Sequence, residues 1–394
     1  MPLAPPPEEA LYHQRFSVSY GYPVLFCRGA LDPSSDTLAW AVARAEPERR
    51  HPTFAVIDQG LADAQGDLEA RVTAYAEAHA SVLELRAEPE LLPGGEASKH
   101  DPRLLDWLAK RFVETKLDRH ATVLVIGGGA VLDAAGYAAS TFHRGVRTVR
   151  MPSTVLAQCD GGVGVKTGVN GHGAKNLFGT FAPPHAVVND ELLLETLPLR
   201  EARAGMAEAV KVGLIRDATL FEFLESNAEA LSQAAREPLR ELVRRAARLH
   251  LAHIAGGGDP FETGSARPLD YGHWAAHKLE MLSGHELRHG EAVAIGMLLD
   301  ARYAELSGLL PTSARARLET LLDRLGLPLY HPALDASSSE LPLLLEGLDE
   351  FREHLGGELC VTLLTDIGRS VEVHSMDTGR VADAVRYLTE RRGR

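Results

Sequence analysis

The sequence predicts an α/β domain followed by a mainly α-helical domain, and three observations lead to this fold class. A chain of 394 residues is long enough for two domains that each bury a core. From about residue 15 to residue 190, apolar strand-like runs alternate with helix-like segments, as in a mostly parallel sheet. After Leu197, long stretches with apolar residues at helical spacing dominate. We place the boundary near residue 194, which gives domains of residues 1–193 and 194–394.

The elements follow in chain order from these patterns. Strands are expected at residues 53–58, 121–127, 148–152 and 186–190, with helices between them that include residues 68–79 and 102–115. Helical stretches then cover residues 202–227, 229–254, 272–283, 290–307 and 313–325, before a strand-like pair at 359–364 and 370–375. Residues 1–14 are proline-rich and lack the features of a secretory signal, so they are predicted to be a flexible leader. An active site is expected between the two domains.

Composition narrows the class of partner. A net charge of −13 argues against nucleic acid, which is bound through an excess of basic residues. No apolar run approaches the roughly 20 residues that span a bilayer, so no membrane partner is expected. The cysteines, Cys27, Cys159 and Cys360, are odd in number and scattered, which argues against a disulfide framework. The sequence therefore predicts a cytoplasmic protein with a small-molecule partner.

Two glycine-rich segments are suited to bind anions. In residues 125–136, VIGGGAVLDAAG, a strand runs through three glycines into a helix whose N-terminus could receive a phosphate. The spacing is not the usual GxGxxG, and a tight strand–helix turn is the simpler interpretation of this segment alone. Residues 154–179 hold seven glycines together with Asp160, Lys166, Lys175 and Asn176. We expect this segment to be a loop with poor secondary structure whose N–H groups and lysines surround an anion.

Carboxylates and histidines in the second half suggest a metal site. Glu208 and Lys211 share a helix face, which by itself is more often an exposed pair. His273 and His277 also share a face, and His289 directly precedes the segment GEAVAIGM. Histidines and a carboxylate beside glycine breaks are typical of a metal site with an open position.

One short segment also matches the pattern of a zinc protease, which would be an alternative to this interpretation. Residues 285–289 read His-Glu-Leu-Arg-His, which matches HExxH. That pattern requires one continuous helix, whereas Gly284 and Gly290 bracket the match. We expect the helix to begin at Gly290, which disfavours a protease.

Taken together, these segments resemble the dehydroquinate synthase superfamily, the sugar phosphate cyclases. The resemblance runs from VIDQG near residue 58 to TLLTDIG near residue 367. It rests on seven segments in the same order: GGGAVLDAAG, ASTFHRGV, STVLAQCDGGVGVKTGVN, AKNLFG, AEAVKVGLI, DYGH and HGEAVAIGM. It implies an NAD-binding α/β domain, a metal-binding helical domain and a homodimer.

The resemblance also implies roles for individual positions. The implied metal ligands are Glu208, His273 and His289, a set that suits Zn²⁺, with Co²⁺ as an alternative. The positions that match NAD contacts are Asp58, Glu96, Lys99, Gly127, Gly128, Gly129, Asp133, Ser153, Thr154, Asp160 and Lys175. Those that match substrate and phosphate contacts are Arg144, Lys166, Lys175, Asn176, Asp270 and His277, where Arg144 would reach the phosphate of the neighbouring subunit. The implied catalytic residues are Asp160, Lys166, Lys211 and His277.

The reaction implied by the resemblance recycles its cofactor. A ring hydroxyl beside the metal is oxidised by NAD, which acidifies the neighbouring C–H and lets phosphate leave by elimination. The hydride is then returned, the ring opens, and an intramolecular aldol step closes a carbocycle. Confinement between the domains protects the reactive intermediates from water.

The sequence departs from dehydroquinate synthase where that enzyme binds its substrate carboxylate. The arginine of that enzyme is replaced by Ala266, with Arg267 adjacent, and its asparagine by Asp270. Two further lysine positions carry His250 and either Arg352 or His354. Because a buried carboxylate without a partner is costly, these changes favour a neutral substrate, sedoheptulose 7-phosphate, and a product of the 2-epi-valiolone type.

Three alternatives stay open from the sequence. A diverged cyclase could take another sugar phosphate, or the chain could be a 3-dehydroquinate synthase in which Arg267 serves the carboxylate. An NAD- and metal-dependent polyol dehydrogenase of the glycerol dehydrogenase type shares the two-domain plan and a GGG turn. Such an enzyme needs no phosphate lysines, so the group of Lys166, Lys175 and Asn176 counts against it.

Overall fold

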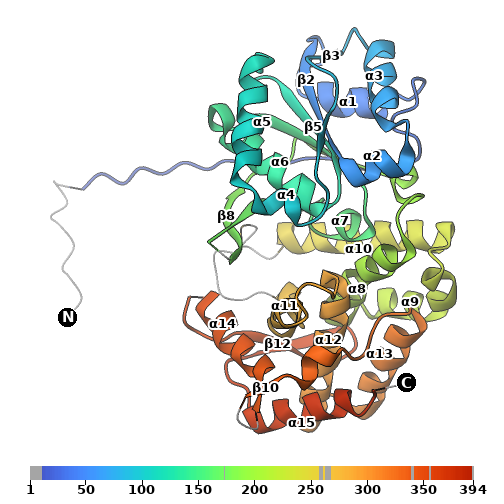
Figure 1. Cartoon of the computed structure of the whole chain (residues 1–394), viewed down its shortest axis with the longest axis vertical. Helices are drawn as coiled ribbons and strands as arrows, with labels where there is room; N and C mark the ends of the chain where they lie inside the picture. The colour runs from blue at the N-terminus through green and yellow to red at the C-terminus, as the bar shows by residue number, and fades with distance from the viewer. Residues whose placement is uncertain are drawn as a thin grey trace.

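The structure, a computed structural model, describes residues 11–172, 174–256, 261, 268–338, 341–354 and 356–392. The α/β half lies above the helical half along the long axis of the molecule (Figure 1). The predicted fold class is therefore confirmed. Within the described ranges, no helix is both long and apolar enough to cross a membrane.

A seven-stranded parallel sheet forms the centre of the first half, in the order β1-β9-β6-β5-β2-β3 with β4 also paired to β2. Its strands are β1 (Val24–Cys27), β2 (His51–Asp58), β3 (Leu83–Leu85), β4 (Glu90–Leu92), β5 (Thr122–Gly127), β6 (Arg147–Pro152) and β9 (Ala186–Asp190). The four predicted strands are all present. The strands that were not predicted, β1, β3 and β4, have only three or four residues, too few for a pattern.

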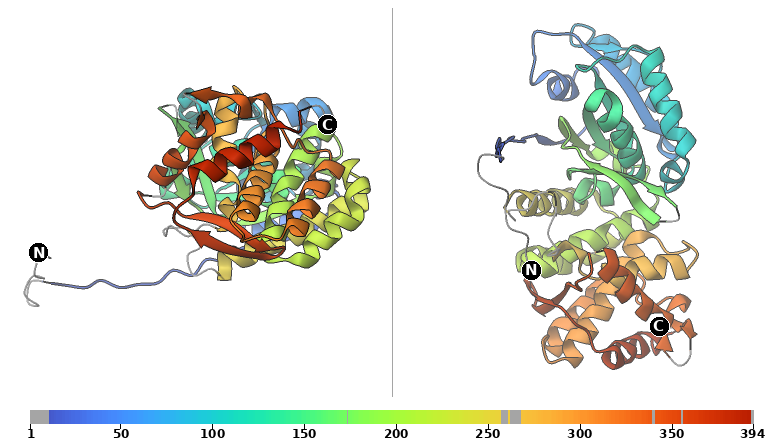
Figure 2. Two further views of the ribbon diagram at one scale, coloured as in Figure 1. Left: turned by 90° about the horizontal axis from the view of Figure 1, so that it is seen from below. Right: turned by 90° about the vertical axis from the view of Figure 1, so that its left-hand side faces the viewer.

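Helices cover both faces of this sheet (Figure 2). They are α1 (Thr37–Ala43), α2 (Gln59–Gln65), α3 (Leu68–Ala78), α4 (Ala97–His100), α5 (Pro102–Glu114), α6 (Gly129–Thr141) and α7 (Val155–Cys159). Alternate residues of β2 belong to different cores, with Ile57 packed near α1 and α3 and Val56 near α5 and α6. Because both faces are buried, the central strands are mostly apolar, which made them visible in the sequence.

The strand order reverses next to β2, at the carboxyl end of the sheet. After β2 the chain adds β3 and β4 on one side, and it then returns to place β5, β6 and β9 on the other side. The carboxyl ends of β2 and β5 are neighbours at this reversal, and they carry Asp58 and Gly127. Ligands of open α/β sheets bind at such a reversal of strand order.

The glycine-rich segment is not the loop that the sequence predicted. Most of it folds into α7 and an antiparallel hairpin of β7 (Lys166–Gly171) and β8 (Ala174–Phe181). The glycines permit close packing, since a Cβ on Gly179 would lie 2.6 Å from the Thr167 carbonyl oxygen and one on Gly171 would lie 2.5 Å from the ring of Phe178. The prediction was wrong because it took these glycines as a sign of backbone freedom rather than of close approach.

The second half is mainly helical, with a large apolar core. Its helices are α8 (Leu199–Arg216), α9 (Ala218–Ser232), α10 (Arg236–Gly256), α11 (His273–Leu282), α12 (His289–Leu306), α13 (Thr312–Arg324), α14 (Glu346–His354) and α15 (Thr378–Thr389). Two small sheets pair β10 (Ser337–Ser338) with β11 (Leu341–Pro342) and β12 (Val361–Asp366) with β13 (Arg369–Val373). Short 3-10 turns are η2 (Phe142–Arg144), η3 (Glu191–Leu194), η4 (Pro268–Asp270), η5 (Pro332–Asp335) and η6 (Leu343–Leu345).

Some predicted boundaries in this half were wrong. The stretch 202–227 is two helices, because the Asp217 side chain accepts hydrogen bonds from the N–H groups of Thr219 (2.8 Å) and Leu220 (3.2 Å) and starts α9. The next helix begins at Arg236, after Ala234 has taken a positive φ of 52°. The strand pair near the C-terminus is confirmed as β12 and β13, whereas α14 and α15 were not predicted. The domain boundary near residue 194 stays a prediction; it falls between the sheet, which ends at Asp190, and α8.

A buried arginine fastens the hairpin to the sheet. Arg150 in β6 is 1% exposed, and its guanidinium donates to the carbonyl oxygens of Gly164 (3.0 Å), Lys166 (3.3 Å) and Ala182 (3.4 Å). These carbonyls lie in the segments that enter and leave the hairpin. Arg150 therefore positions the strand on which Lys166 stands.

We predict that Arg150→Met lowers the free energy of unfolding by about 3 kcal/mol, because three carbonyls lose a charged donor in a buried place. Urea unfolding followed by circular dichroism measures the loss. Arg147→Met is the matched control on the same strand, since Arg147 is partly exposed and pairs with Glu46, and it should cost clearly less. Equal losses for the two variants would contradict the role given to Arg150.

Candidate active site

The glycine turn after β5 lies directly against Asp58. A Cβ on Gly127 would lie 2.9 Å from the Asp58 Cβ, and one on Gly128 would lie 3.3 Å from the Thr154 Cγ2. The Asp58 carboxylate accepts from the Gly60 N–H (2.9 Å) and the Gly128 N–H (3.4 Å), so it joins the ends of β2 and β5. The turn leads into α6, whose N-terminus has no side-chain cap, and free N–H groups at a helix start fit the pyrophosphate of a dinucleotide.

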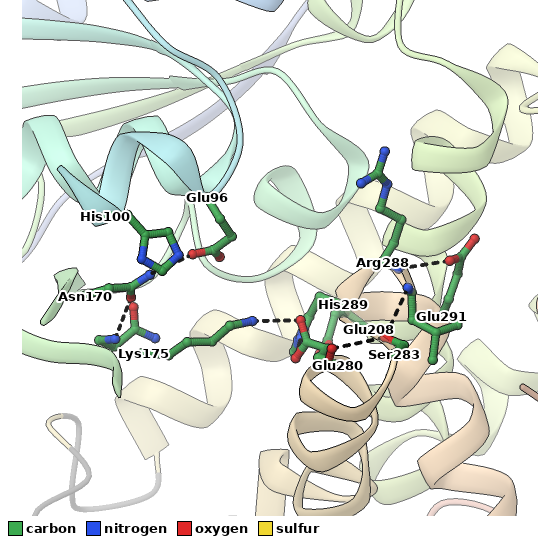
Figure 3. A network of polar contacts seen from close by, with 12 residues as sticks. Glu96, His100, Asn170, Lys175, Glu208, Glu280, Ser283, Arg288, His289 and Glu291 are labelled. Atoms are coloured by element: carbon green, nitrogen blue, oxygen red, sulfur yellow. Dashed lines mark hydrogen bonds and ion pairs between the residues drawn. The ribbon is translucent and has the colours of Figure 1, made fainter. Parts of the chain in front are cut away.

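Most of the other positions predicted to contact NAD lie around this turn. The Lys99 ammonium is 2.6 Å from the Asp133 carboxylate, which links α4 to α6. Burial raises the pKa of Asp133, and the nearby Lys99 offsets this only in part. Ser153 is buried at the end of β6, and the Thr154 hydroxyl accepts from the Ala157 N–H at 3.1 Å to begin α7. Glu96 accepts a hydrogen bond of 3.0 Å from Asn170 of the hairpin (Figure 3).

Three side chains from three helices converge in the second half. Glu208 comes from α8, and His273 and His289 are the first residues of α11 and α12. The Glu208 Oε1 lies 3.7 Å from the His273 Nε2 and 3.6 Å from the His289 Nε2, and the three ligand atoms lie within 4.8 Å of one another. The structure thus brings the three predicted metal ligands together, although their binding of an ion stays a prediction.

Glycines allow the three helices to approach so closely. A Cβ on Gly290 of α12 would overlap the carbonyl oxygen of Ala204 in α8. A Cβ on Gly296 would likewise overlap the carbonyl oxygen of Gly272, which itself has a φ of +78° just before α11. Helix spacing at the ligands is therefore set by direct backbone contact.

The donor atoms around Glu208 fit a divalent cation. The His273 Nδ1 is 3.1 Å from the Tyr271 carbonyl oxygen, and the His289 Nδ1 is 3.3 Å from the Glu280 Oε2. Both histidines thereby present Nε2 to Glu208, as ligating histidines do when the other nitrogen donates outward. The Glu208 Oε1 is buried and accepts no hydrogen bond within the described residues. A cation at this point would satisfy it.

The pKa shifts of His289 and Glu280 also indicate a place for a cation. Burial lowers the pKa of His289, but the nearby Glu208 and Glu280 carboxylates outweigh burial and raise it to about 9. The pKa of Glu280 is lowered to about 2, because His289 and Lys175 outweigh its burial. The carboxylates therefore hold a positive charge between them. A metal ion would displace the proton of His289, so that metal affinity should fall as the pH falls.

Lys211 and Asp160 lie beside the three candidate metal ligands. Lys211, one turn from Glu208, forms an ion pair with the Glu208 Oε2, and its Nζ is 3.7 Å from the Asp160 Oδ2. Burial lowers the pKa of Lys211, but Glu208, Asp160 and Asp270 reverse this and raise it. His250 of α10 is buried, with its Nδ1 3.5 Å from the Asp160 Oδ1. The side chains of Lys211, Asp160 and His250 can therefore hold and transfer protons next to Glu208.

A chain of contacts joins the two halves at the site. The Lys175 ammonium of β8 is 2.8 Å from the Glu280 Oε1, while the other oxygen of Glu280 faces His289 (Figure 3). His277 lies close by, with its ring centroid 5.6 Å from that of His273 and 6.2 Å from that of His289. His277, Glu280 and His289 form a second group that could hold a metal, but it is more exposed than the first.

Some predicted site residues do not gather here within one chain. Lys166 pairs with Phe181 at the open end of the hairpin, whereas Lys175 and Asn176 stand near its turn. Arg144 is exposed and precedes β6, at the end of the strand opposite to Ser153, and its contact with the phosphate of a neighbouring subunit stays a prediction. Arg352 is exposed and pairs with Asp349 at 2.7 Å. Ala266 and Arg267 lie outside the described residues, as does the side chain of His354.

The protease alternative does not fit the structure. His285 has a φ of +65° and lies between α11, which ends at Leu282, and α12, which begins at His289. The two histidines of the HExxH match therefore cannot share a helical face. The helix begins within one residue of the predicted Gly290.

Sequence reasoning missed three polar residues that hold the site together. Glu280 stands seven residues after His273 and three after His277, a helical spacing that could have identified it. Asn170 gave no comparable signal, because its partners Glu96 and His100 are distant in the chain. The third, Asp300, is fully buried in α12.

Asp300 holds the turn that leads into α11. Its carboxylate accepts from the Gly272 N–H (3.0 Å) and the Trp274 indole N–H (2.8 Å) on either side of His273. Burial raises the pKa of Asp300 to about 7, although both hydrogen bonds oppose this. The orientation of His273 thus depends on a carboxyl group that α12 keeps away from water.

Comparisons with known proteins agree with this geometry. Residues 90–204 match the 3-dehydroquinate synthase N-terminal family and residues 205–345 the C-terminal family. The 2-epi-5-epi-valiolone synthase of Streptomyces glaucescens is 41% identical over 262 residues, 66% of each chain. The 3-dehydroquinate synthase of Halorhodospira halophila is 37% identical over 82% of this chain and 92% of its own. The structure of ValA, a 2-epi-5-epi-valiolone synthase from Streptomyces hygroscopicus subsp. jinggangensis with NAD+ and Zn2+ bound, has a TM-score of 0.84 at 28% identity and covers 96% of this chain and 100% of its own.

We predict that Glu280→Gln weakens zinc binding roughly 10- to 100-fold, because the His289 Nδ1 loses its charged acceptor. Competition with a chromophoric chelator at constant pH measures the affinity. Glu286→Gln is the control on the exposed segment before α12 and should leave the affinity unchanged. An affinity of Glu280→Gln equal to that of the unaltered protein would contradict the orienting role.

The buried Asp300 carboxyl also predicts a pH dependence. Its pKa is raised above the value of about 3.9 in an unfolded chain, so the folded state binds the extra proton between about pH 4 and pH 7. The contribution of Asp300 to stability is therefore present at low pH and lost as the pH rises through about 7. Relative to Asp300→Asn, the unaltered protein should lose up to about 1.4 kcal/mol per pH unit in this window. Asp323→Asn, an exposed control, should show the slope of the unaltered protein, and a wild-type slope in Asp300→Asn would refute the assignment.

Proposed function

The chain belongs to the 3-dehydroquinate synthase family, and from this membership we propose that it converts sedoheptulose 7-phosphate into a C7 cyclitol. It would act as a sugar phosphate cyclase that eliminates phosphate and recycles its NAD. The sequence favours a product of the 2-epi-valiolone type, while the two similar valiolone synthases are named for 2-epi-5-epi-valiolone. We therefore assign the class of product and leave its stereochemistry to the experiment below.

We propose that NAD binds at the glycine turn and Zn²⁺, or Co²⁺, at Glu208, His273 and His289. ValA, which shares the fold, has NAD+ and Zn2+ bound. When bound, NAD supplies a reversible hydride acceptor and the metal polarises a substrate oxygen. The unsatisfied Glu208 Oε1 and the close approach of Gly127 to Asp58 support the two positions.

The chain's own groups would then handle protons and phosphate. Lys211 and Asp160 lie beside the metal ligands, where they can hold the proton of a substrate hydroxyl. His277 lies next to both ligating histidines and can carry a proton towards solvent, because it is exposed. Lys166, Lys175 and Asn176 of the hairpin are the phosphate candidates, and Arg144 would be added from a second subunit of a homodimer. Closure between the halves would keep water from the reacting sugar.

The observation that carries the choice of substrate is the position of His250. His250 is buried, and its Nδ1 lies 3.5 Å from the Asp160 Oδ1. The helix that carries it is where the carboxylate-binding relatives are expected to have a lysine. A substrate carboxylate at this point would face Asp160 without the lysine that offsets the repulsion. A neutral hydroxymethyl group can instead hydrogen-bond to an imidazole. Arg352, the other candidate cation among the described residues, is turned to Asp349 on the protein surface.

One other function has specific support, and a polyol dehydrogenase stays an alternative from the sequence. The 37% identity with a 3-dehydroquinate synthase over most of both chains favours that activity if Arg267 binds a carboxylate. A polyol dehydrogenase would share the NAD and metal sites, but it would accumulate NADH. The same measurement separates all three.

We predict that protein loaded with zinc and NAD releases phosphate from sedoheptulose 7-phosphate but not from 3-deoxy-arabino-heptulosonate 7-phosphate. Absorbance at 340 nm should show no net NADH, and NMR with mass spectrometry identifies the cyclitol. His250→Ala should lower kcat/KM for the sugar about 10- to 100-fold, the worth of one buried hydrogen bond.

Arg352→Ala is the control for these assays and should behave as the unaltered protein, since Arg352 is exposed. Turnover of the carboxylate substrate would refute the choice of substrate and assign a 3-dehydroquinate synthase. Net NADH without phosphate release would refute the cyclase and assign a dehydrogenase.

A further inference from the structure

A cavity of about 420 Å³ lies between the two halves, apart from the site described above. None of the residues that line it belongs to the sets proposed for NAD, metal or substrate. The α/β half contributes the end of β1, with Phe26, and the turn η3, with Leu194. The helical half contributes α8 and one face of α10, with Leu239 and Val243. Cavities of this size at domain boundaries are typical of small-ligand sites.

The helix α7 separates this cavity from the glycine turn. Val155 and Gln158 of α7 line the cavity. Thr154, which caps the same helix, lies against Gly128, and Asp160 follows the helix and faces Lys211. The two places are therefore close but distinct, and a ligand in one does not occupy the other.

The lining combines apolar surface with an excess of positive charge. Four arginines line the cavity, namely Arg28, Arg236, Arg240 and Arg244, against two glutamates, Glu191 and Glu195. The difference, four minus two, is +2 in a chain whose net charge is −13. Such a reversal of sign at one cavity favours an anion.

Among the four arginines of the cavity, Arg244 is the one best placed to bind an anion. Arg28 is 2.7 Å from Glu195, and Arg236 and Arg240 lie 3.4 Å and 3.9 Å from Glu191. Arg244 forms no ion pair within the described part of the chain, and its guanidinium lies over the Phe26 ring, 5.8 Å from the centroid. A guanidinium stacked in this way keeps its N–H edge available for a carboxylate or phosphate.

We propose that this cavity binds a small organic anion with an apolar body, whose carboxylate or phosphate pairs with Arg244. The apolar body lies on Phe26 and on the leucines of η3 and α10. Since its walls come from both halves, the ligand joins them at a place away from the metal.

The experiment uses 8-anilinonaphthalene-1-sulfonate, an aromatic body with one anionic group that fluoresces in apolar surroundings. It is titrated into the full chain at saturating NAD and zinc. Arg244→Met should weaken binding about tenfold, the worth of one charge-assisted pair. Arg245→Met is the matched control, because Arg245 is the next residue of α10, stacks on Phe223 and pairs with Glu241 without lining the cavity.

Binding at saturating NAD that is weakened in Arg244→Met and unchanged in Arg245→Met supports the proposal. Circular dichroism must show that both variants are folded, and a melting temperature that rises with the probe in the control alone adds to the support. Displacement of the probe by NAD, equal binding by the two variants, or no binding to the unaltered protein would overturn it.

Discussion

The Glu208 carboxylate is 2% exposed, and its Oε1 accepts no hydrogen bond within the described residues although two imidazoles face it. A buried carboxylate is stable only when its charge is balanced, since an unpaired one costs at least several kcal/mol. Lys211 balances one oxygen, and the other is left for a cation. Other features of the helical half are arranged around this carboxylate. Close contacts at glycines bring α11 and α12 to it. The Nδ1 contacts of the two histidines orient both Nε2 atoms toward it.

The two halves carry complementary chemical groups where they face each other. Parallel strands gather Asp58 and the glycine turn at their carboxyl ends, where a dinucleotide phosphate finds free N–H groups. The short helix α7 begins beside this turn, after Thr154, and ends at Cys159, directly before Asp160, which contacts Lys211 of the helical half. A dinucleotide held at the turn and a polarising ion at Glu208 would therefore lie near the two ends of a single helix of five residues.

Sequence patterns predicted what depends on local spacing and failed where distant segments meet. The central strands and the helix start at His289 follow from burial and from a glycine break, and both were predicted closely. The resemblance named Glu208, His273 and His289, and the fold brings them together. The hairpin was mistaken for a loop because its glycines are needed for close contacts with Thr167 and Phe178 on the opposite strands, and such contacts cannot be seen from the local sequence. Asp300 was missed because its partners come from another element, and no spacing within one helix encodes such partners. Glu280 does stand at a helical spacing from His273 and His277, but that spacing was not used.

Under the proposed function, the double contact of Glu280 would couple phosphate binding to metal binding. One of its oxygens holds the Lys175 ammonium of the hairpin, and the other orients His289. A phosphate that approaches Lys175 shares the ammonium with Glu280, which leaves more negative charge for the His289 N–H. A more strongly polarised imidazole is a better metal ligand, because its Nε2 becomes more basic. Under the proposed function, phosphate binding by the α/β half would thus strengthen metal binding by the helical half through three side chains, without a movement of the helices that carry the candidate metal ligands.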